Sequence, residues 1–126
     1  MIHIYKSKSE TDSSLQALEA LEPGCWINIV APSEEELMLI SKKTGAPLDF
    51  LKAPLDDEET SRIDFEDNNL LIILDIPFTE MEDNSLIYDT YSLGIIHTEK
   101  EIITVCLKNS RMFQDFVEGK VKSFFT

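Results

Sequence analysis

At Arg62-Ile63-Asp64-Phe65-Glu66-Asp67-Asn68-Asn69-Leu70-Leu71-Ile72-Ile73-Leu74-Asp75-Ile76, the hydrophobic pattern of the chain changes from helical to strand-like. From here on, residues 62–66, 69–76, 85–98 and 101–107 predict four strands. Acidic or Asn-containing connections at 67–68, 80–84 and 99–100 separate them. Because the last connection is short, we expect the final two strands to form an antiparallel hairpin.

Two more strands and a short helix are expected near the start of the chain. Residues 1–6 alternate apolar and polar side chains, and residues 25–30 are apolar enough to be covered on both faces. Residues 12–22 predict a helix that Asp12 or Ser13 caps, with leucines at positions 15, 18 and 21. Pro23-Gly24 would end this helix.

The clearest helix start is Pro32-Ser33-Glu34-Glu35-Glu36, where Ser33 and Glu36 have the spacing of a capping box. Lys42 and Lys43 suit the last turn of this helix, and Gly45 suits the left-handed position that follows it. A further short helix is expected from Pro47 through residue 51, ended by Pro54. A terminal helix is expected over residues 110–126, with no cap at its end, which indicates a longer parent protein.

This order of elements predicts an α/β fold. Successive strand–helix units suggest some parallel pairing near the start, and the later strands add antiparallel pairing. A mixed parallel/antiparallel β-sheet with helices packed on it satisfies both. The 126 residues are enough for one domain, and no linker or repeat divides them.

Composition limits the possible partners. The formal net charge of −13 excludes nucleic acid and disfavours anionic lipid surfaces, but leaves divalent cations and basic protein surfaces. No apolar run approaches the roughly 20 residues of a membrane-spanning helix, and no signal peptide is recognisable. Cys25 and Cys106 are isolated in apolar stretches and are expected to be buried, reduced thiols, which fits the cytosol.

Few residues could carry chemistry, and none of them predicts an enzyme. There is no Gly-rich phosphate loop and no nucleophile elbow. His3 and His97 have no partner at zinc-ligand spacing and are expected to be ordinary strand residues. Asp75, within an apolar run, is either a buried carboxylate or a residue that marks the end of its strand or pairs with a neighbour.

The densest charge lies at Asp56, Asp57, Glu58 and Glu59. With three more acidic residues by position 67, seven carboxylates fall within twelve positions, against Arg62 as the one positive charge. The segment is either a solvated acidic turn or a weak site for Mg²⁺ or Ca²⁺, which prefer oxygen ligands. Its spacing does not match a calcium-binding EF-hand loop. Arg62 is expected to pair with Glu58 or Glu59.

Four stretches carry a resemblance to a known family. Residues 47–48 and 55–67, together with Cys25-Trp26-Ile27-Asn28-Ile29, Leu71-Ile72-Ile73-Leu74-Asp75-Ile76-Pro77 and Thr90-Tyr91-Ser92-Leu93-Gly94-Ile95-Ile96, stand in the same order as in CorA-type transporters. They resemble the N-terminal cytoplasmic domain of these magnesium (divalent cation) transporters. The similarity covers roughly residues 2–124.

The resemblance implies both a fold and a function. The fold would be an α/β/α sandwich, and residues 1–126 would be a single cytoplasmic domain whose stalk and transmembrane helices are absent from this chain. The domain would belong to a homopentamer on the cytoplasmic side of the membrane, would contribute to assembly and Mg²⁺-dependent gating, and would not transport alone. It would contact the membrane only through the missing part.

One departure from the family concerns the regulatory metal site. The resemblance places an acidic pair at the end of the short helix after Pro47-Leu48, but this chain has Leu51-Lys52-Ala53 there. That site therefore does not carry over, and Asp56, Asp57, Glu58 and Glu59 are the remaining candidate ligands for Mg²⁺. The alternative function is a freestanding acidic module that binds a basic protein and has no metal chemistry.

Overall fold

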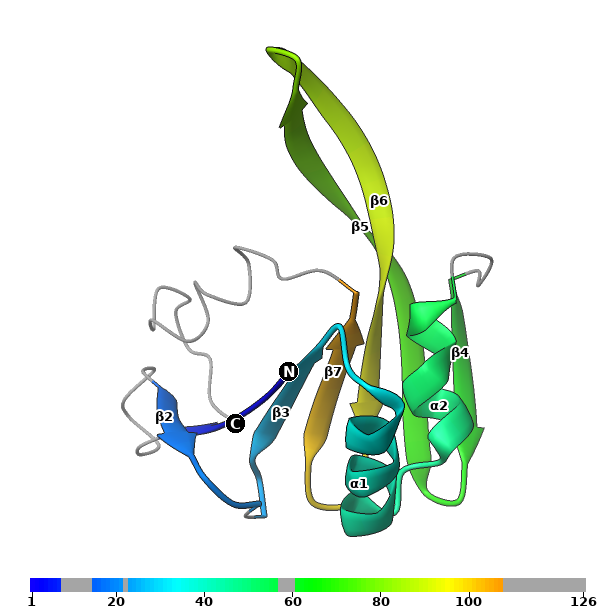
Figure 1. Cartoon of the computed structure of the whole chain (residues 1–126). Helices are drawn as coiled ribbons and strands as arrows, with labels where there is room; N and C mark the ends of the chain where they lie inside the picture. Colours follow the sequence, from blue (N-terminus) through cyan, green and yellow to red (C-terminus); the bar gives the residue numbers. More distant parts are fainter. Residues whose placement is uncertain (8–14, 22, 57–60, 108–126) are drawn as a thin grey trace.

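A seven-stranded mixed sheet organises the computed structural model, which describes residues 1–7, 15–21, 23–56 and 61–107 (Figure 1). The strands lie in the order β2-β1-β3-β7-β6-β5-β4. Their bounds are β1 Ile2–Ser7, β2 Leu15–Leu18, β3 Trp26–Val30, β4 Arg62–Glu66, β5 Asn69–Glu82, β6 Ser85–His97 and β7 Ile102–Cys106. β3 and β7 pair in parallel, and every other neighbouring pair in this sheet is antiparallel. The predicted mixed sheet and the β6–β7 hairpin are confirmed.

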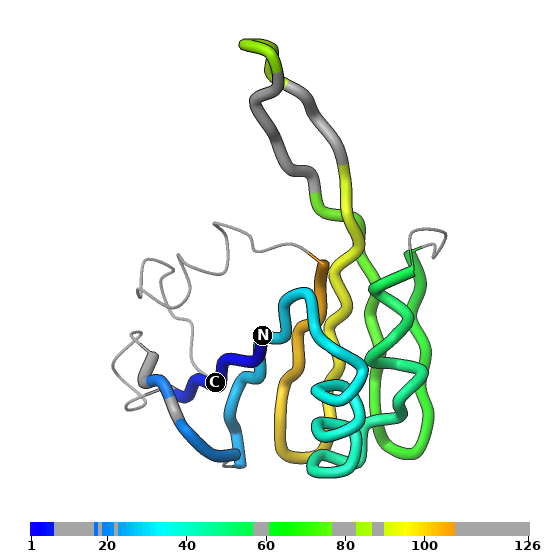
Figure 2. Tube along the Cα trace, in the orientation of Figure 1, coloured from blue at the N-terminus to red at the C-terminus, as the bar shows by residue number. Residues whose placement is uncertain are grey.

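Three helical segments follow β3: α1 Glu34–Thr44, α2 Leu48–Lys52 and the 3-10 turn η1 Ala53–Leu55. The predicted capping box is present, since Ser33 Oγ accepts from Glu36 N at 3.2 Å and Glu36 Oε1 accepts from Ser33 N at 2.9 Å. Gly45 ends α1 with φ 78°, the left-handed conformation that favours glycine. α1 and α2 lie side by side over the same face of the sheet (Figures 1 and 2).

The main core lies between these helices and the face of the sheet that they cover, which we call the first face. Its fully buried aliphatic side chains come from α2 and from the four central strands of the sheet: Ile27, Ile29, Leu51, Leu71, Ile73, Ile96, Ile103 and Val105. Contact at β6 is close because Gly94 lies against Pro54 of η1, where a Cβ atom would overlap the proline ring. A glycine is therefore required here by packing.

Alternation along the strands places a different set of side chains on the opposite, second face. Trp26, Leu93 and Cys106 are buried there in a smaller cluster that includes no residue of α1, α2 or η1. Towards the β4 edge, Ile63 and Phe65 are 73% and 66% exposed. The predicted terminal helix 110–126 lies outside the described residues.

Two predicted elements differ in the structure. The helix expected over 12–22 is wrong in its described part, because residues 15–18 form β2, which pairs with β1 from Ile4↔Leu18 to Ser7↔Leu15. A helix of about eleven residues is marginal in water, whereas β2 satisfies backbone groups along an edge of β1. β5 extends to Glu82, past the predicted end at residue 76, and turns at Asp83-Asn84 with φ 49° and 62°.

Candidate functional site

The acidic segment begins immediately after η1. Asp56 is exposed and its backbone N–H donates to Ala53 O at 3.2 Å. Asp57, Glu58 and Glu59 lie outside the described residues. In the part of the chain that is described, no three His, Cys, Asp or Glu side chains come together as metal ligands. The candidate site at 56–59 therefore stays a prediction.

The remaining acidic residues of this region are on or next to β4. Arg62 Nη1 donates to Asp64 Oδ2 at 3.1 Å, and Asp64 Oδ1 also accepts from Phe65 N at 2.8 Å. Both side chains are 40% or more exposed, so this ion pair contributes no more than about 1 kcal/mol to stability. Glu58 and Glu59, the predicted partners of Arg62, are not among the described residues.

Asp75 lies in the middle of β5, exposed, with Ser61 Oγ 3.5 Å from its Oδ2 atom. Of the two interpretations left open by the sequence, the buried carboxylate is wrong. His3 and His97 are exposed strand residues of β1 and β6, as predicted. Cys25 and Cys106 are both buried thiols without a disulfide, which is also as predicted.

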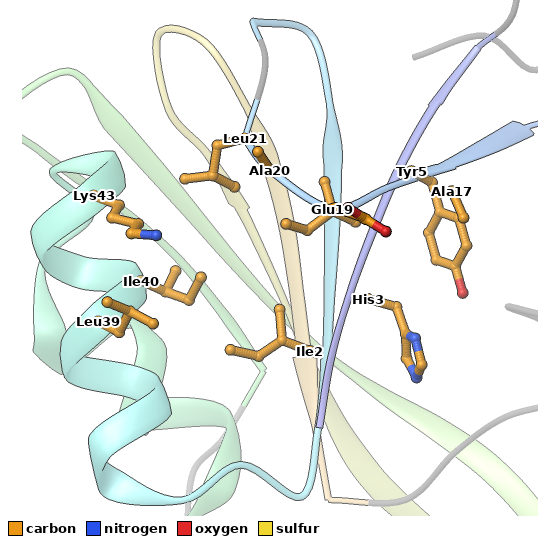
Figure 3. A pocket seen from close by; sticks show the side chains of 11 residues that line it. Ile2, His3, Tyr5, Ala17, Glu19, Ala20, Leu21, Leu39, Ile40 and Lys43 are labelled. Atoms are coloured by element: carbon orange, nitrogen blue, oxygen red, sulfur yellow. The ribbon is translucent and has the colours of Figure 1, made fainter.

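A groove of about 490 Å³ opens between β1 and α1 (Figure 3). Its aliphatic lining comes from Ile2 and Ile4 of β1, Leu21, and Leu39 and Ile40 of α1. Lys43 reaches into the space from the last turn of α1, while His3 and Tyr5 lie on the other side of β1. The groove suits an apolar side chain with a negative charge beside it.

The groove was not predicted, although the sequence holds a signal for it. Residues 37–40 are four consecutive apolar residues, which cannot all face the same side of one helix. Leu37 and Ile40 are buried in the core, whereas Met38 and Leu39 are 56% and 47% exposed. An unbroken apolar run in an otherwise amphipathic helix therefore indicates a second apolar surface.

Carboxylates at the start of α1 are held by positive groups. Glu36 Oε1 accepts from the Met1 amino group at 3.2 Å, and the Ser33 backbone N–H is the main reason that the pKa of Glu36 lies below its ordinary value. Lys52 Nζ lies 2.7 Å from Glu34 Oε1 and lowers the pKa of Glu34 through this hydrogen bond and its charge. Lys52, at the end of α2, thus forms an ion pair with the exposed start of α1.

A buried polar network on the second face was also not predicted. Trp26 Nε1 donates to Thr104 Oγ1 at 2.9 Å, and Thr104 Oγ1 donates to Asn28 Oδ1 at 3.0 Å. Asn28 and Thr104 are less than 8% exposed. None of these three side chains is ionisable, so their hydrogen bonds position β3 against β7 and offer no acid–base chemistry.

No described helix has the length and apolar character needed to cross a membrane. No family model matches the chain. Over 80 residues it is 35% identical to the cobalt/magnesium transport protein CorA of Methanocaldococcus jannaschii, an alignment that covers 64% of this chain and 24% of that protein. The chain thus spans about a quarter of the length of the curated relative that it matches.

Solved structures agree with this sequence relationship. The soluble domain of CorA from M. jannaschii superposes with a TM-score of 0.73 at 24% identity, over 100% of this chain and 49% of that one. The complete CorA magnesium transporter of the same organism superposes with a TM-score of 0.71 at 23% identity. This superposition covers 90% of this chain and 34% of that one. The ZntB cytoplasmic domain from Vibrio parahaemolyticus superposes with a TM-score of 0.62 at 15% identity, which covers 90% of this chain and 46% of that one. The resemblance drawn from the sequence is confirmed: the chain is similar in sequence to a CorA transport protein and has the fold of the CorA soluble domain.

Proposed function

We propose that this chain is a cytoplasmic regulatory and assembly domain of a divalent cation transporter of the CorA type. The observation that carries the proposal is the joint agreement of sequence and fold: 35% identity to a cobalt/magnesium transport protein and superposition of the whole chain on the CorA soluble domain. The domain is not an enzyme and does not transport ions by itself. Ions would cross through membrane helices that lie outside these 126 residues.

The working unit is a ring of identical subunits, by the resemblance a homopentamer, with this domain on the cytoplasmic side of the membrane. In such a ring the domain has two tasks, which are to hold neighbouring subunits together and to respond to the ion. The net charge of −13 favours a local excess of divalent cations around the domain, since acidic surfaces concentrate counter-ions.

Mg²⁺ regulation would depend on the acidic turn in this chain. The Leu51-Lys52-Ala53 stretch contains no carboxylate. Leu51 is fully buried in the core, and Lys52 is paired with Glu34. Asp56, Asp57, Glu58 and Glu59 would supply oxygen ligands in its place, completed by water or by a neighbouring subunit. A hard cation would relieve the mutual repulsion of these carboxylates, so its binding would favour the conformation that brings them closest.

The first test is to sequence the parent gene beyond the codon for Thr126. We expect a long amphipathic helix followed by two apolar stretches of about 20 residues, with Gly-Met-Asn after the first. A stop codon directly after Thr126 would contradict the transporter assignment. The net charge of −13 would then favour the second candidate, a freestanding acidic module that binds a basic protein.

The metal site is tested in the full-length parent with D56N/D57N/E58Q/E59Q. We expect Mg²⁺ uptake in this variant to lose its dependence on internal Mg²⁺. The matched control is E19Q/E35Q/D83N/E99Q, which removes four exposed carboxylates elsewhere and should leave that dependence intact. Equal behaviour of the two variants would show that overall charge, and not the acidic turn, responds to the ion.

A further inference from the structure

The second face of the sheet exposes apolar side chains at the β4 edge. β4 is the last strand of the sheet, so its outer edge pairs with no other strand in the described part of the chain (Figure 1). Ile63 and Phe65 are 73% and 66% exposed, and Leu74 on neighbouring β5 is 45% exposed. The β4–β5 register and the alternation of side chains put all three on one face. Exposed apolar side chains scattered singly are normal, but a contiguous group marks an interaction surface.

Two carboxylates follow Phe65 directly. Glu66 ends β4, and Asp67 begins the two-residue turn to β5 with φ 50°. Both are exposed, and neither is in an ion pair with another described residue. Arg62, the positive charge of β4, is paired with Asp64. The three exposed apolar side chains with Glu66 and Asp67, which we call the β4 corner, therefore present an aromatic ring with negative charge beside it.

The β1–α1 groove is complementary to this corner. Its aliphatic lining includes Leu39, which is 47% exposed. Lys43 extends into the groove from the last turn of α1, with Lys42 beside it in the sequence (Figure 3). Both lysines are exposed, and neither is in an ion pair with another described residue. Glu19 is the one carboxylate among the lining residues, so an apolar side chain in the groove would meet positive charge on the α1 side.

A single copy of the chain cannot bring these two surfaces together. Four strands, β3, β7, β6 and β5, lie between β1 and β4. At the usual spacing of strands this separates β1 from β4 by about 24 Å. The groove also lies on the first face, beside the main core, whereas the apolar side chains of the β4 corner are on the second. A contact between corner and groove therefore joins two copies.

We propose that the β4 corner of one copy docks into the β1–α1 groove of a second copy. Phe65 enters the groove, and Glu66 and Asp67 meet the two lysines of α1. This local pairing of opposite charges offsets the general repulsion between two copies that each carry a net charge of −13. Corner and groove are different surfaces, so the contact is head-to-tail, and repeating it generates a ring when the rotation closes. This inference rests on the proposed function only in that both require copies of the chain to assemble.

Cysteine cross-linking between copies tests the contact directly. Isotopically labelled D67C chain is mixed with unlabelled K43C chain and a short bismaleimide, and the cross-linked species are identified by mass spectrometry; the native cysteines are buried. We expect the mixed D67C–K43C dimer well above the share that random pairing gives. The control is D83C, because Asp83 is also exposed and begins an equivalent Asp-Asn turn with φ 49°. Equal yields from D67C and D83C would overturn the proposal.

The apolar part of the contact is tested by sedimentation as a function of concentration. Phe65→Ser should weaken self-association by about tenfold or more, as loss of a central aromatic anchor does. Its urea midpoint should stay close to that of wild type, because the side chain is 66% exposed. The control Leu86→Ser changes a side chain that is 50% exposed on β6 and should leave self-association unchanged. Equal weakening by the two variants would contradict the docking.

A charge exchange tests the ionic part in the same way. K43E and D67K should each weaken self-association by about tenfold or more, and the double variant K43E/D67K should recover most of it. D83K, the same change at the equivalent turn, should not rescue K43E. A wild-type chain that stays monomeric at millimolar concentration, or a double variant no better than the single ones, would overturn the docking. Neither result depends on whether the parent gene encodes membrane helices, so the proposed function would stand or fall separately.

Discussion

The two faces of the sheet are stabilised in different ways. On the first face, α1 and α2 cover a large core of apolar side chains. On the second face, the Trp26–Thr104–Asn28 hydrogen bonds lie beside a small apolar cluster, and Ile63, Phe65 and Leu74 are exposed. We therefore expect changes of side-chain volume on the first face to lower the stability of the fold. On the second face, stability should depend on the hydrogen bonds at its centre, and substitutions at the β4 edge should have little effect.

Two leucines of β5 give the sharpest contrast, since they differ in face but not in residue type. Leu71 is 0% exposed on the first face and Leu74 is 45% exposed on the second. We expect Leu71→Ala to lower the free energy of unfolding by about 3–4 kcal/mol, through lost burial and the cavity left behind. Leu74→Ala should cost less than about 1 kcal/mol. Urea unfolding measures both, and similar costs would break the distinction between the faces.

Gly94 tests close packing on the first face. A methyl group at this position would overlap Pro54, so Gly94→Ala should cost about 2–3 kcal/mol. The double variant G94A/P54A should cost less than the sum of the two single changes, because replacing the proline ring with a methyl group makes room. Gly45→Ala is the contrasting control: nothing lies within 4 Å of a Cβ there, and φ 78° should cost only about 1 kcal/mol.

Thr104 tests the polar network of the second face. Thr104→Val keeps the shape but removes the acceptor of the buried Trp26 Nε1–H···Oγ1 hydrogen bond. We expect a loss of about 2 kcal/mol in the free energy of unfolding. Trp26→Phe removes the donor as well, so T104V should cost clearly less in the W26F background. Additive costs in this double-mutant cycle would mean that the hydrogen bond contributes nothing.

Most of the first face could be predicted from the sequence because its signals are local. The capping box at Ser33 and Glu36, the stop at Gly45 and the proline-bounded helix α2 each lie within a few residues of one another. The helix predicted over residues 12–22 is wrong for the opposite reason, since its outcome depends on a distant strand. Their leucine spacing fits a helix, but β2 forms because β1 presents an edge to pair with, and no local pattern reports that edge.

The candidate sites also divide into one that a local sequence signal indicated and one that depends on contacts between distant segments. Charge density alone singled out residues 56–59, and three of these four positions lie outside the described residues. The β1–α1 groove depends on how a strand and a helix from separate parts of the chain meet, so only the apolar run 37–40 hinted at it. The full length of β5 was missed because the acidic residues Glu80 and Glu82 suggested a connection, although both continue the β5–β6 ladder.

The smallest expected effect is the pH dependence of the helix that covers the first face. Glu36 accepts hydrogen bonds from Ser33 N and the Met1 amino group, and its folded-state pKa lies below the ordinary value of 4.5. Between these two values the unfolded chain binds more protons, so the stabilisation is complete above about pH 4.5 and is lost as the pH falls through the folded-state pKa.

Glu36→Gln should remove this contribution, so the difference in urea midpoint between wild type and variant should be largest near pH 6 and shrink towards pH 3. Glu35→Gln removes a carboxylate from the same turn but no capping bond, and its difference from wild type should change less with pH. A constant difference for Glu36→Gln across this range would mean that the capping bond, and not the charge, fixes the start of α1 over the first face.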